Sequence, residues 1–249
     1  MSKIFLATTI AKAAKENCLK NCNAPENQST RRILPVVPAA ALAVAFAFSL
    51  PQLAHAEIHV GKVPDNIKVP AGNHAFLEGH GVGTQNYICA PSASSPTGVA
   101  YTLFTPQATL FNDDSQQLIT HFFSPSPSEV NTNPAVIAPG AIRVTWQHRD
   151  SSAVWGKVRP ADPTVPGDLG DSSTDPNFVA LGAVAWLKVT ATATEAGPNG
   201  GDTLTKTTFI QRLNTSGGLA PKTGCSTATD LGHQAFVPYK ADYFFYKAN

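Results

Sequence analysis

Charged side chains are scarce in this chain of 249 residues: Asp, Glu, Lys and Arg make up 14 % of it, and the formal net charge is +1. Residues 1–56 hold six of the 18 Lys and Arg and two of the 17 Asp and Glu, so the remainder carries 12 against 15, a net charge of −3. Such a remainder lacks the basic surface of nucleic-acid-binding proteins and the polybasic patch that binds anionic membranes. Neither kind of partner is predicted.

The short motifs of familiar enzymes are also missing. The chain has no Gly-x-Ser-x-Gly, no His-Glu-x-x-His and no phosphate-binding loop, which removes the recognisable hydrolase and nucleotide-binding patterns. The glycine cluster at 79–83 is followed by a strand-like run instead of a helix, and Thr84 stands where a dinucleotide fingerprint needs its third glycine. A Ser-His-Asp set assembled from distant residues stays open, but we predict no catalytic residue.

No apolar run is long enough for a membrane-spanning helix. The longest, Ile33–Leu50, is cut by two prolines to about a dozen residues, short of the roughly 20 that cross a bilayer. It follows Arg31-Arg32 and leads to a small-x-small ending at Ala56, the parts of a secretory signal. We predict that residues 1–56 are a signal peptide, of general or twin-arginine type, and that the mature protein is periplasmic or secreted with no membrane span.

Cysteine is rare, with four in the chain, and two of these lie in the predicted signal. The remaining pair, Cys89 and Cys225, is most simply a disulfide in an oxidising compartment. Two free thiols or a thiolate metal site are the alternatives. Neither cysteine belongs to a Cys-x-x-Cys pair and no histidine sits at zinc-finger spacing.

Residues 57–249 show no convincing helical pattern. The clearest element is Ala185–Glu195, in which apolar Leu, Val and Ala alternate with Lys and Thr, as in a half-buried strand. It predicts a hairpin with Thr203–Arg212 across a Gly- and Asn-rich turn. Further strands are predicted at Gly83–Cys89, Val99–Phe104, Ala108–Phe111, Gln117–Phe123, Ala141–Trp146, Ala153–Val158 and Ala241–Tyr246.

This pattern predicts an all-β fold: a single antiparallel β-sandwich or barrel-like domain over residues 57–249, with one disulfide. Long Pro- and Gly-rich loops are expected at Ser124–Gly140 and Arg159–Pro176, and an entry arm at Glu57–Gly72. The last strand is expected to pair with an early one, since Cys225 must reach Cys89.

Aromatic side chains suggest a ligand site. Trp146, His148 and Trp155 lie on or beside the predicted 141–158 hairpin, where exposed Trp could stack on a small molecule, a glycan or an envelope component. Trp146 and His148 share strand parity, so both could face one pocket, with Arg143 or Asp150 at its rim. The alternative is that Trp155 and Trp186 belong to the core. His121 is a further candidate, because an enzyme of this kind would join His121 or His148 to a carboxylate.

One histidine could hold a metal. If cleavage follows Ala56, the mature terminus reads Glu57-Ile58-His59, and its amine, two amides and imidazole suit Cu(II) or Ni(II) in a square plane. Copper at His59 is the one cofactor for which the residues offer a candidate, and the site depends on cleavage at that residue.

Several different short motifs follow one another along the mature chain. They include Gly83-x-Gln85-x-Tyr87-x-Cys89, Phe104-Thr105-Pro106, His121-Phe122, Trp186-Leu187, Ile210-Gln211-Arg212, Thr215-x-Gly217-Gly218-x-Ala220-Pro221, Gly224-Cys225 and Val237-Pro238-Tyr239-x-Ala241-x-Tyr243-x-Phe245. In these the chain resembles the domain of unknown function 3455 family of secreted bacterial and fungal proteins. The resemblance implies one domain and a Cys89–Cys225 pairing, and it implies no activity. Many relatives carry Gly-Pro-Thr-Trp after the His, where this chain has Ser124-Pro125-Ser126-Pro127, so Trp146 has no assured counterpart in them.

The sequence thus favours a non-catalytic module that binds a ligand or associates with the cell envelope. An enzyme with a His/carboxylate site and a copper-binding periplasmic protein are the alternatives. The sequence predicts no oligomeric state.

Overall fold

The computed structural model describes residues 58–132 and 140–249. The predicted signal peptide, its cleavage position and residues 133–139 lie outside the described residues. Helical structure in the described part is limited to two 3-10 turns, η1 (Asp65–Ile67) and η2 (Ala228–Asp230). None of the described helices is long and apolar enough to cross a membrane.

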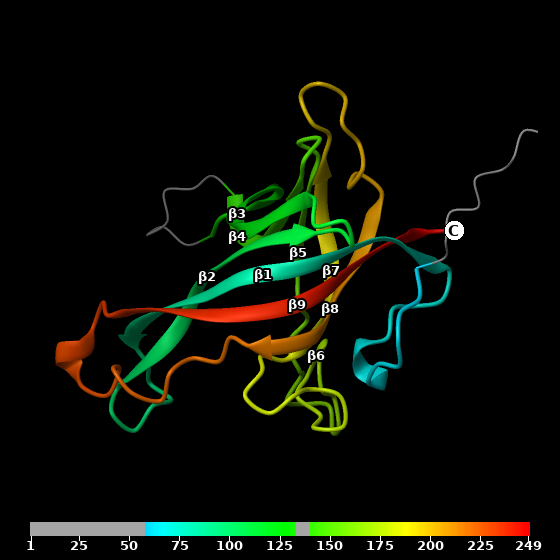
Figure 1. Ribbon diagram of the computed structural model, residues 1–249. Coiled ribbons are helices and arrows are strands. Elements are labelled where there is room, and N and C mark those ends of the chain that lie inside the picture. The colour runs from blue at the N-terminus through cyan, green and yellow to red at the C-terminus, as the bar shows by residue number, and fades with distance from the viewer. Residues whose placement is uncertain (1–57, 133–139) are drawn as a thin grey trace, which may run out of the picture. The chain divides into compact units, whose positions relative to one another are not determined.

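Nine antiparallel strands make up the fold (Figure 1). Eight of them close into a barrel in which neighbours in sequence are neighbours in space: β1 pairs with β9, and β5 pairs with β7 to complete the ring. The short β6 pairs with β7 outside this ring. Their bounds are β1 (Asn73–Pro91), β2 (Val99–Phe111), β3 (Gln117–Val130), β4 (Gly140–His148), β5 (Ala153–Lys157), β6 (Ser172–Ser173), β7 (Trp186–Glu195), β8 (Thr207–Gly217) and β9 (Gln234–Ala248). The all-β prediction is confirmed, and the barrel is the form that it takes.

The glycine cluster of β1 lets large side chains fill the barrel. Gly79, Gly81 and Gly83 lie on the same strand face as Gln85, and that face points inward. A Cβ atom on Gly81 would lie 2.8 Å from the Tyr243 ring, and one on Gly83 would lie 2.1 Å from the carbonyl oxygen of Gln107. The missing side chains therefore allow close strand approach and leave room for core residues of β2 and β9.

Several predicted strand ends were wrong: β1 begins at Asn73 instead of Gly83, β8 is Thr207–Gly217 instead of Thr203–Arg212, and β9 begins at Gln234 instead of Ala241. Two further errors involve proline. Val99–Phe104 and Ala108–Phe111 form one strand, β2, and β3 continues through Pro125 to Val130 instead of ending at Phe123. Pro106 pairs with β1, whereas the β2–β3 pairing begins only at Ala108. Pro125 likewise pairs with β4 alone. A strand with a partner on one side can accept proline, because the missing N–H faces no acceptor.

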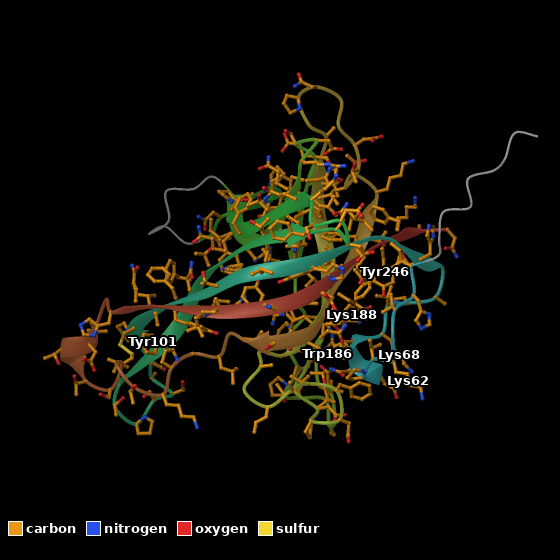
Figure 2. The ribbon with its side chains drawn as sticks, viewed as in Figure 1. Lys62, Lys68, Tyr101, Trp186, Lys188 and Tyr246 are labelled. Carbon is orange, nitrogen blue, oxygen red and sulfur yellow. A yellow bond between two sulfur atoms is a disulfide. The ribbon has the colours of Figure 1, made fainter. Side chains whose placement is uncertain are left out.

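A second hydrophobic cluster lies outside the barrel and receives the entry arm. Ile67 is fully buried there against Trp186, Leu213, Phe244 and Tyr246, and Val60, Val63 and Val69 pack around it. Figure 2 shows Trp186 and Tyr246 on the side of the sheet where the arm with Lys62 and Lys68 runs. The side-chain amide of Gln211 donates to the Ile67 carbonyl at 2.7 Å, which fixes the arm on β8.

The predicted disulfide is confirmed. Cys89, near the end of β1, bonds to Cys225, with Cα atoms 5.4 Å apart. Backbone hydrogen bonds flank the bridge: the Cys89 amide donates to the His233 carbonyl, and the Gly232 amide donates to the Cys89 carbonyl. The bridge therefore holds the long segment before β9 against the end of β1.

Candidate ligand cavity

The barrel contains a cavity of about 420 Å³ at one end. It is lined from β2 by Leu103 and Pro106 and from β3 by His121 and Phe123. These residues stand where β2 and β3 separate, since the pairing of the two strands stops at Ala108 and His121. Leu103 and Leu219, which also line the cavity, are 37 % and 49 % exposed. The cavity is thus open to solvent beside the gap between β2 and β3.

Aromatic rings form the inner wall of this cavity. Trp146 of β4 stacks on the His121 ring, with centroids 4.5 Å apart and planes inclined by 11°. Tyr243 of β9 meets the Trp146 ring edge-on at 6.1 Å, and Phe245 does so at 6.2 Å from the side away from the cavity. All four side chains are at most 3 % exposed, so the wall is closely packed.

Two hydrogen-bond donors in the cavity wall have no partner. Gln85 and Trp146 are 2 % and 1 % exposed, yet the Trp146 Nε1 makes no hydrogen bond and the Gln85 Nε2 makes none of regular geometry, although Gln85 lies close enough to the Tyr239 hydroxyl to oppose the rise that burial causes in the pKa of that hydroxyl. A buried donor left unpaired costs about 1–3 kcal/mol. A bound acceptor would remove that cost for both residues.

Arg212 of β8 adds a positive charge to the same cavity. Its Nε and Nη2 donate to the Ala185 carbonyl at 3.2 and 2.8 Å, which fixes the guanidinium on a neutral acceptor. It forms no ion pair with any carboxylate of the described chain. Burial raises the pKa of Tyr243, and the charge of Arg212 together with hydrogen bonds from Tyr239 and Arg212 opposes that rise, so the guanidinium also lies beside the Tyr243 hydroxyl. The cavity is therefore apolar with one uncompensated cation.

His121 is neutral in this environment. Burial, opposed by a hydrogen bond to Thr145 and assisted by the positive charge of Arg212, lowers the pKa of its imidazole to about 3. That bond joins Nδ1 to the Thr145 carbonyl oxygen at 2.9 Å. A carbonyl can only accept, so Nδ1 carries the proton and Nε2 remains an acceptor. His121 thus offers the cavity a neutral acceptor instead of a second cation.

Acid is expected to destabilise the protein through His121. The unfolded chain binds a proton near pH 6.5 and the folded chain only near pH 3, so stability falls as pH drops between these values. The expected loss from this residue between pH 7 and pH 5 is about 2 kcal/mol, from 1.36 kcal/mol per unit of pKa difference. Urea unfolding of the wild type and of His121→Gln at the two pH values measures it.

The variant isolates His121 from His80, whose pKa is raised by hydrogen bonds to Asp242 and Asp113 and which therefore acts in the opposite direction. Gln keeps a donor for the Thr145 carbonyl and does not titrate. A wild type and a His121→Gln variant that lose equal stability from pH 7 to pH 5 would contradict the assignment.

Of the predicted ligand residues, the structure brings Trp146 and His121 together, but Trp146 is 1 % exposed and stacks on His121, so the prediction of an exposed Trp that stacks on a ligand was wrong for this residue. Trp155 lies on the opposite face of the sheet, because it pairs with Thr145 where Val154 pairs with Trp146. Its indole N–H donates to the Ser124 hydroxyl at 2.8 Å. His148 lies at the far end of β4, outside the cavity, with its Nδ1 2.9 Å from Asp150.

Asp150 is a structural group. It accepts hydrogen bonds from the backbone amides and hydroxyls of Ser152 and Thr203, which outweigh partial burial and lower the pKa of its carboxyl. Arg143, the other predicted rim residue, forms an ion pair with Glu129 at 2.7 Å. His59 is exposed on the entry arm, and Glu57, on which the predicted copper site depends, lies outside the described residues.

Sequence reasoning missed Gln85, Arg212 and Tyr243 as cavity residues. A signal was present: Gln85 and Tyr87 alternate with outward residues after three inward glycines, and Ala241, Tyr243 and Phe245 alternate in the same way on β9. The alternation alone could not tell which face of either strand is the inside of a barrel.

One of the comparisons with known proteins identifies a family. A family model described as "Protein of unknown function (DUF3455)" matches residues 70–247, a range that includes both cysteines and the whole cavity. No curated protein matches the chain, and no solved structure does.

Proposed function

The chain belongs to the DUF3455 family of proteins of unknown function, and from that premise we propose that it is an exported, non-catalytic protein that binds a small apolar carboxylate inside its barrel. Eight-stranded barrels of this size can hold one small ligand. The observation that carries the proposal is the set of donors in the cavity wall: the unpaired Gln85 and Trp146 N–H groups and the uncompensated Arg212. The volume lies within the range of small-molecule sites.

The chemistry of the wall selects the ligand class. The lining is mostly apolar, so the body of the ligand must be apolar too. Hydrogen bonds that involve a charged group contribute about 1.5–3 kcal/mol, which favours an anionic oxygen at Arg212 over a neutral one. A carboxylate can accept from Arg212 and from the amide of Gln85 together. An amine would meet a like charge and no described carboxylate in the lining.

The same observations weigh against the enzyme alternative. A His/carboxylate site needs a carboxyl group beside the imidazole, and the described lining of the cavity contains none. His121 has a pKa near 3 and its Nδ1 proton is committed to Thr145, so it is a poor proton acceptor at neutral pH. Export is supported by the disulfide, which forms and persists in oxidising compartments.

A matched ligand series tests the proposal. Hexanoic to dodecanoic acids, the corresponding primary alcohols and the corresponding amines are titrated into the protein, with tryptophan fluorescence and calorimetry as readouts. We expect the best acid to bind about tenfold or more tightly than its alcohol, from the charge-assisted hydrogen bond. The amine should bind more weakly than both. Equal affinity for acid and amine would overturn the proposal.

Two variants separate binding from folding. Gln85→Leu removes a donor that has no partner in the protein, so stability should be kept while affinity for the acid falls about tenfold. Arg212→Gln keeps a donor for the Ala185 carbonyl but removes the charge, and it should abolish the preference for acid over alcohol. Arg143→Gln, at an arginine outside the cavity that pairs with Glu129, is the matched control and should bind as the wild type does.

A further inference from the structure

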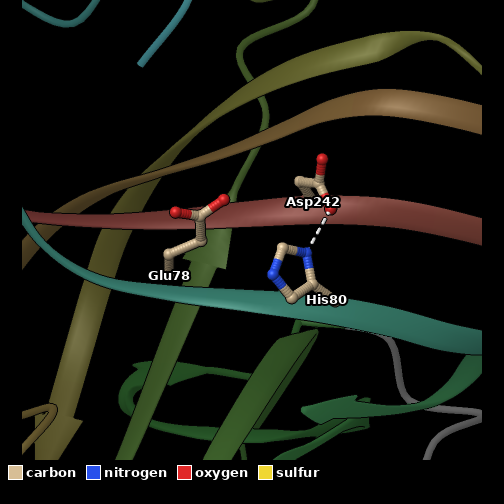
Figure 3. A group of neighbouring side chains, drawn as sticks. All are labelled: Glu78, His80 and Asp242. Carbon is tan, nitrogen blue, oxygen red and sulfur yellow. Dashed lines mark hydrogen bonds and ion pairs between the residues drawn. The ribbon is translucent and has the colours of Figure 1, made fainter. Parts of the chain in front are cut away.

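A cluster of metal-ligating side chains stands on the outer wall of the barrel, apart from the cavity. His80 of β1 lies directly opposite Asp242 of β9 in the strand register. Glu78 precedes His80 by two residues and therefore shares its face. Figure 3 shows the three side chains together over the two strands. One donor atom from each lies within 4.8 Å of the other two.

His80 stands among three carboxylates. Its Nδ1 lies 2.7 Å from Asp242, and its Nε2 lies 2.9 Å from Asp113 in the turn after β2. An imidazole with a carboxylate at each nitrogen carries both protons and is a cation. The charge of His80 balances one of the three carboxylates of Glu78, Asp113 and Asp242, so the group of four side chains has a net charge of −2. No Lys or Arg of the described chain forms an ion pair with any of them.

Glu78 is the group that a simple ion pair does not explain. Its side chain is partly buried, and its carboxylate accepts no hydrogen bond from the described residues. An ion pair between His80 and Asp242 needs no further carboxylate, and a second one nearby is repelled. A divalent cation in place of the His80 proton would bind the oxygen of Glu78 as well as that of Asp242.

The scaffold holds two of these donors firmly. His80 and Asp242 lie within a continuous β1–β9 ladder that runs from Leu77 to Ile88 on the β1 side. The second oxygen of Asp242 accepts a hydrogen bond from the Asn214 amide of β8 at 2.8 Å, which orients the carboxylate. Such outer partners of ligand groups typically change metal affinity by about 10–100-fold. Asp113 lies 2.9 Å from the other ring nitrogen, Nε2, so it can accept the Nε2 proton while Nδ1 binds a metal.

We propose that Glu78, His80 and Asp242 bind a divalent transition-metal ion such as Zn²⁺. The imidazole Nδ1 and two carboxylate oxygens are ligands that Zn²⁺ accepts, with water in the fourth position. The nitrogen donor disfavours Ca²⁺ and Mg²⁺, which prefer oxygen alone. The site is independent of the proposed ligand in the cavity, and either proposal can fail without the other.

Calorimetric titration of chelator-treated protein with Zn²⁺ tests the site. We expect one ion per chain, and we expect Ca²⁺ to bind at least about tenfold more weakly. His80→Gln should abolish the binding, while Glu78→Gln and Asp242→Asn should each weaken it by about tenfold or more. Co²⁺ added in place of Zn²⁺ should give a visible absorption spectrum that His80→Gln removes.

His74→Gln and His59→Gln are the matched controls. His74 lies on the same strand with only Asn249 as its partner, and His59 belongs to the entry arm. Both variants should bind Zn²⁺ as the wild type does. Far-ultraviolet circular dichroism establishes that His80→Gln is folded. A folded His80→Gln that retains the stoichiometry and affinity of the wild type would overturn the proposal, and so would a wild type that does not bind Zn²⁺.

Discussion

Loss of the Cys89–Cys225 disulfide is expected to lower the free energy of unfolding by about 3–5 kcal/mol. The bridge spans 136 residues of sequence, and a cross-link over a loop of that length raises the free energy of the unfolded chain by about 5 kcal/mol at 25 °C, because it removes conformational entropy. The measured contribution of a disulfide to stability is often smaller than this value, because the reduced unfolded chain keeps some structure. Urea unfolding with and without reductant measures the change.

The double variant Cys89→Ser/Cys225→Ser serves as the non-reducible reference. It should unfold slightly below the midpoint of the reduced wild type and should not respond to reductant. Cys89 is 2 % exposed, so a hydroxyl there adds a small cost of its own. A wild type whose midpoint does not move when the disulfide is reduced would show that the cross-link contributes nothing to stability.

Truncation of Trp146 is expected to lower the free energy of unfolding by about 3–5 kcal/mol, the range for a fully buried aromatic side chain replaced by Ala. The indole contacts His121, Tyr243 and Phe245, so its removal opens a void in the inner wall of the cavity. Urea unfolding of Trp146→Ala against the wild type measures the loss.

Trp146→Phe should cost less than Trp146→Ala, because the ring that packs on His121 is kept while the unpaired indole N–H is removed. Leu181→Ala is the surface control: that side chain is fully exposed, and its loss should change stability by less than about 0.5 kcal/mol. A Trp146→Ala variant as stable as the Leu181→Ala variant would mean that Trp146 is not part of a packed wall.

Local patterns predicted most of this fold. The alternation in Ala185–Glu195 correctly placed Leu187 and Val189 on one buried face, which is the inside of the barrel. The even number of cysteines outside the predicted signal correctly predicted the disulfide. What the sequence could not supply was the extent of pairing on each side of a strand. Proline normally ends a strand, but Pro106 and Pro125 lie in strands that have one neighbour at that point, and the predicted ends were wrong for this reason.

The cavity was harder to predict than the barrel. Trp146 and His121 were candidates because of their chemistry, whereas Arg212 comes from a distant strand and joins them only when the ring of strands closes. Trp155 was a candidate only because it is a tryptophan near the hairpin. It lies one residue after Val154, the partner of Trp146, so its side chain points to the outer face, where it donates a hydrogen bond to Ser124. Tertiary pairing, not residue type, decided which aromatic side chains face the cavity.

The position of the inward glycines on β1 determines where the cavity ends. From Gly79 to Gly83 the inner face of β1 carries no side chain, and Leu110 and Tyr243 fill the space there. Gln85 and Tyr87 follow on the same face and line the cavity. The floor therefore sits where glycine gives way to larger residues on one strand. A relative whose glycine series is shorter or longer by one alternation should have a cavity of different depth in the same barrel.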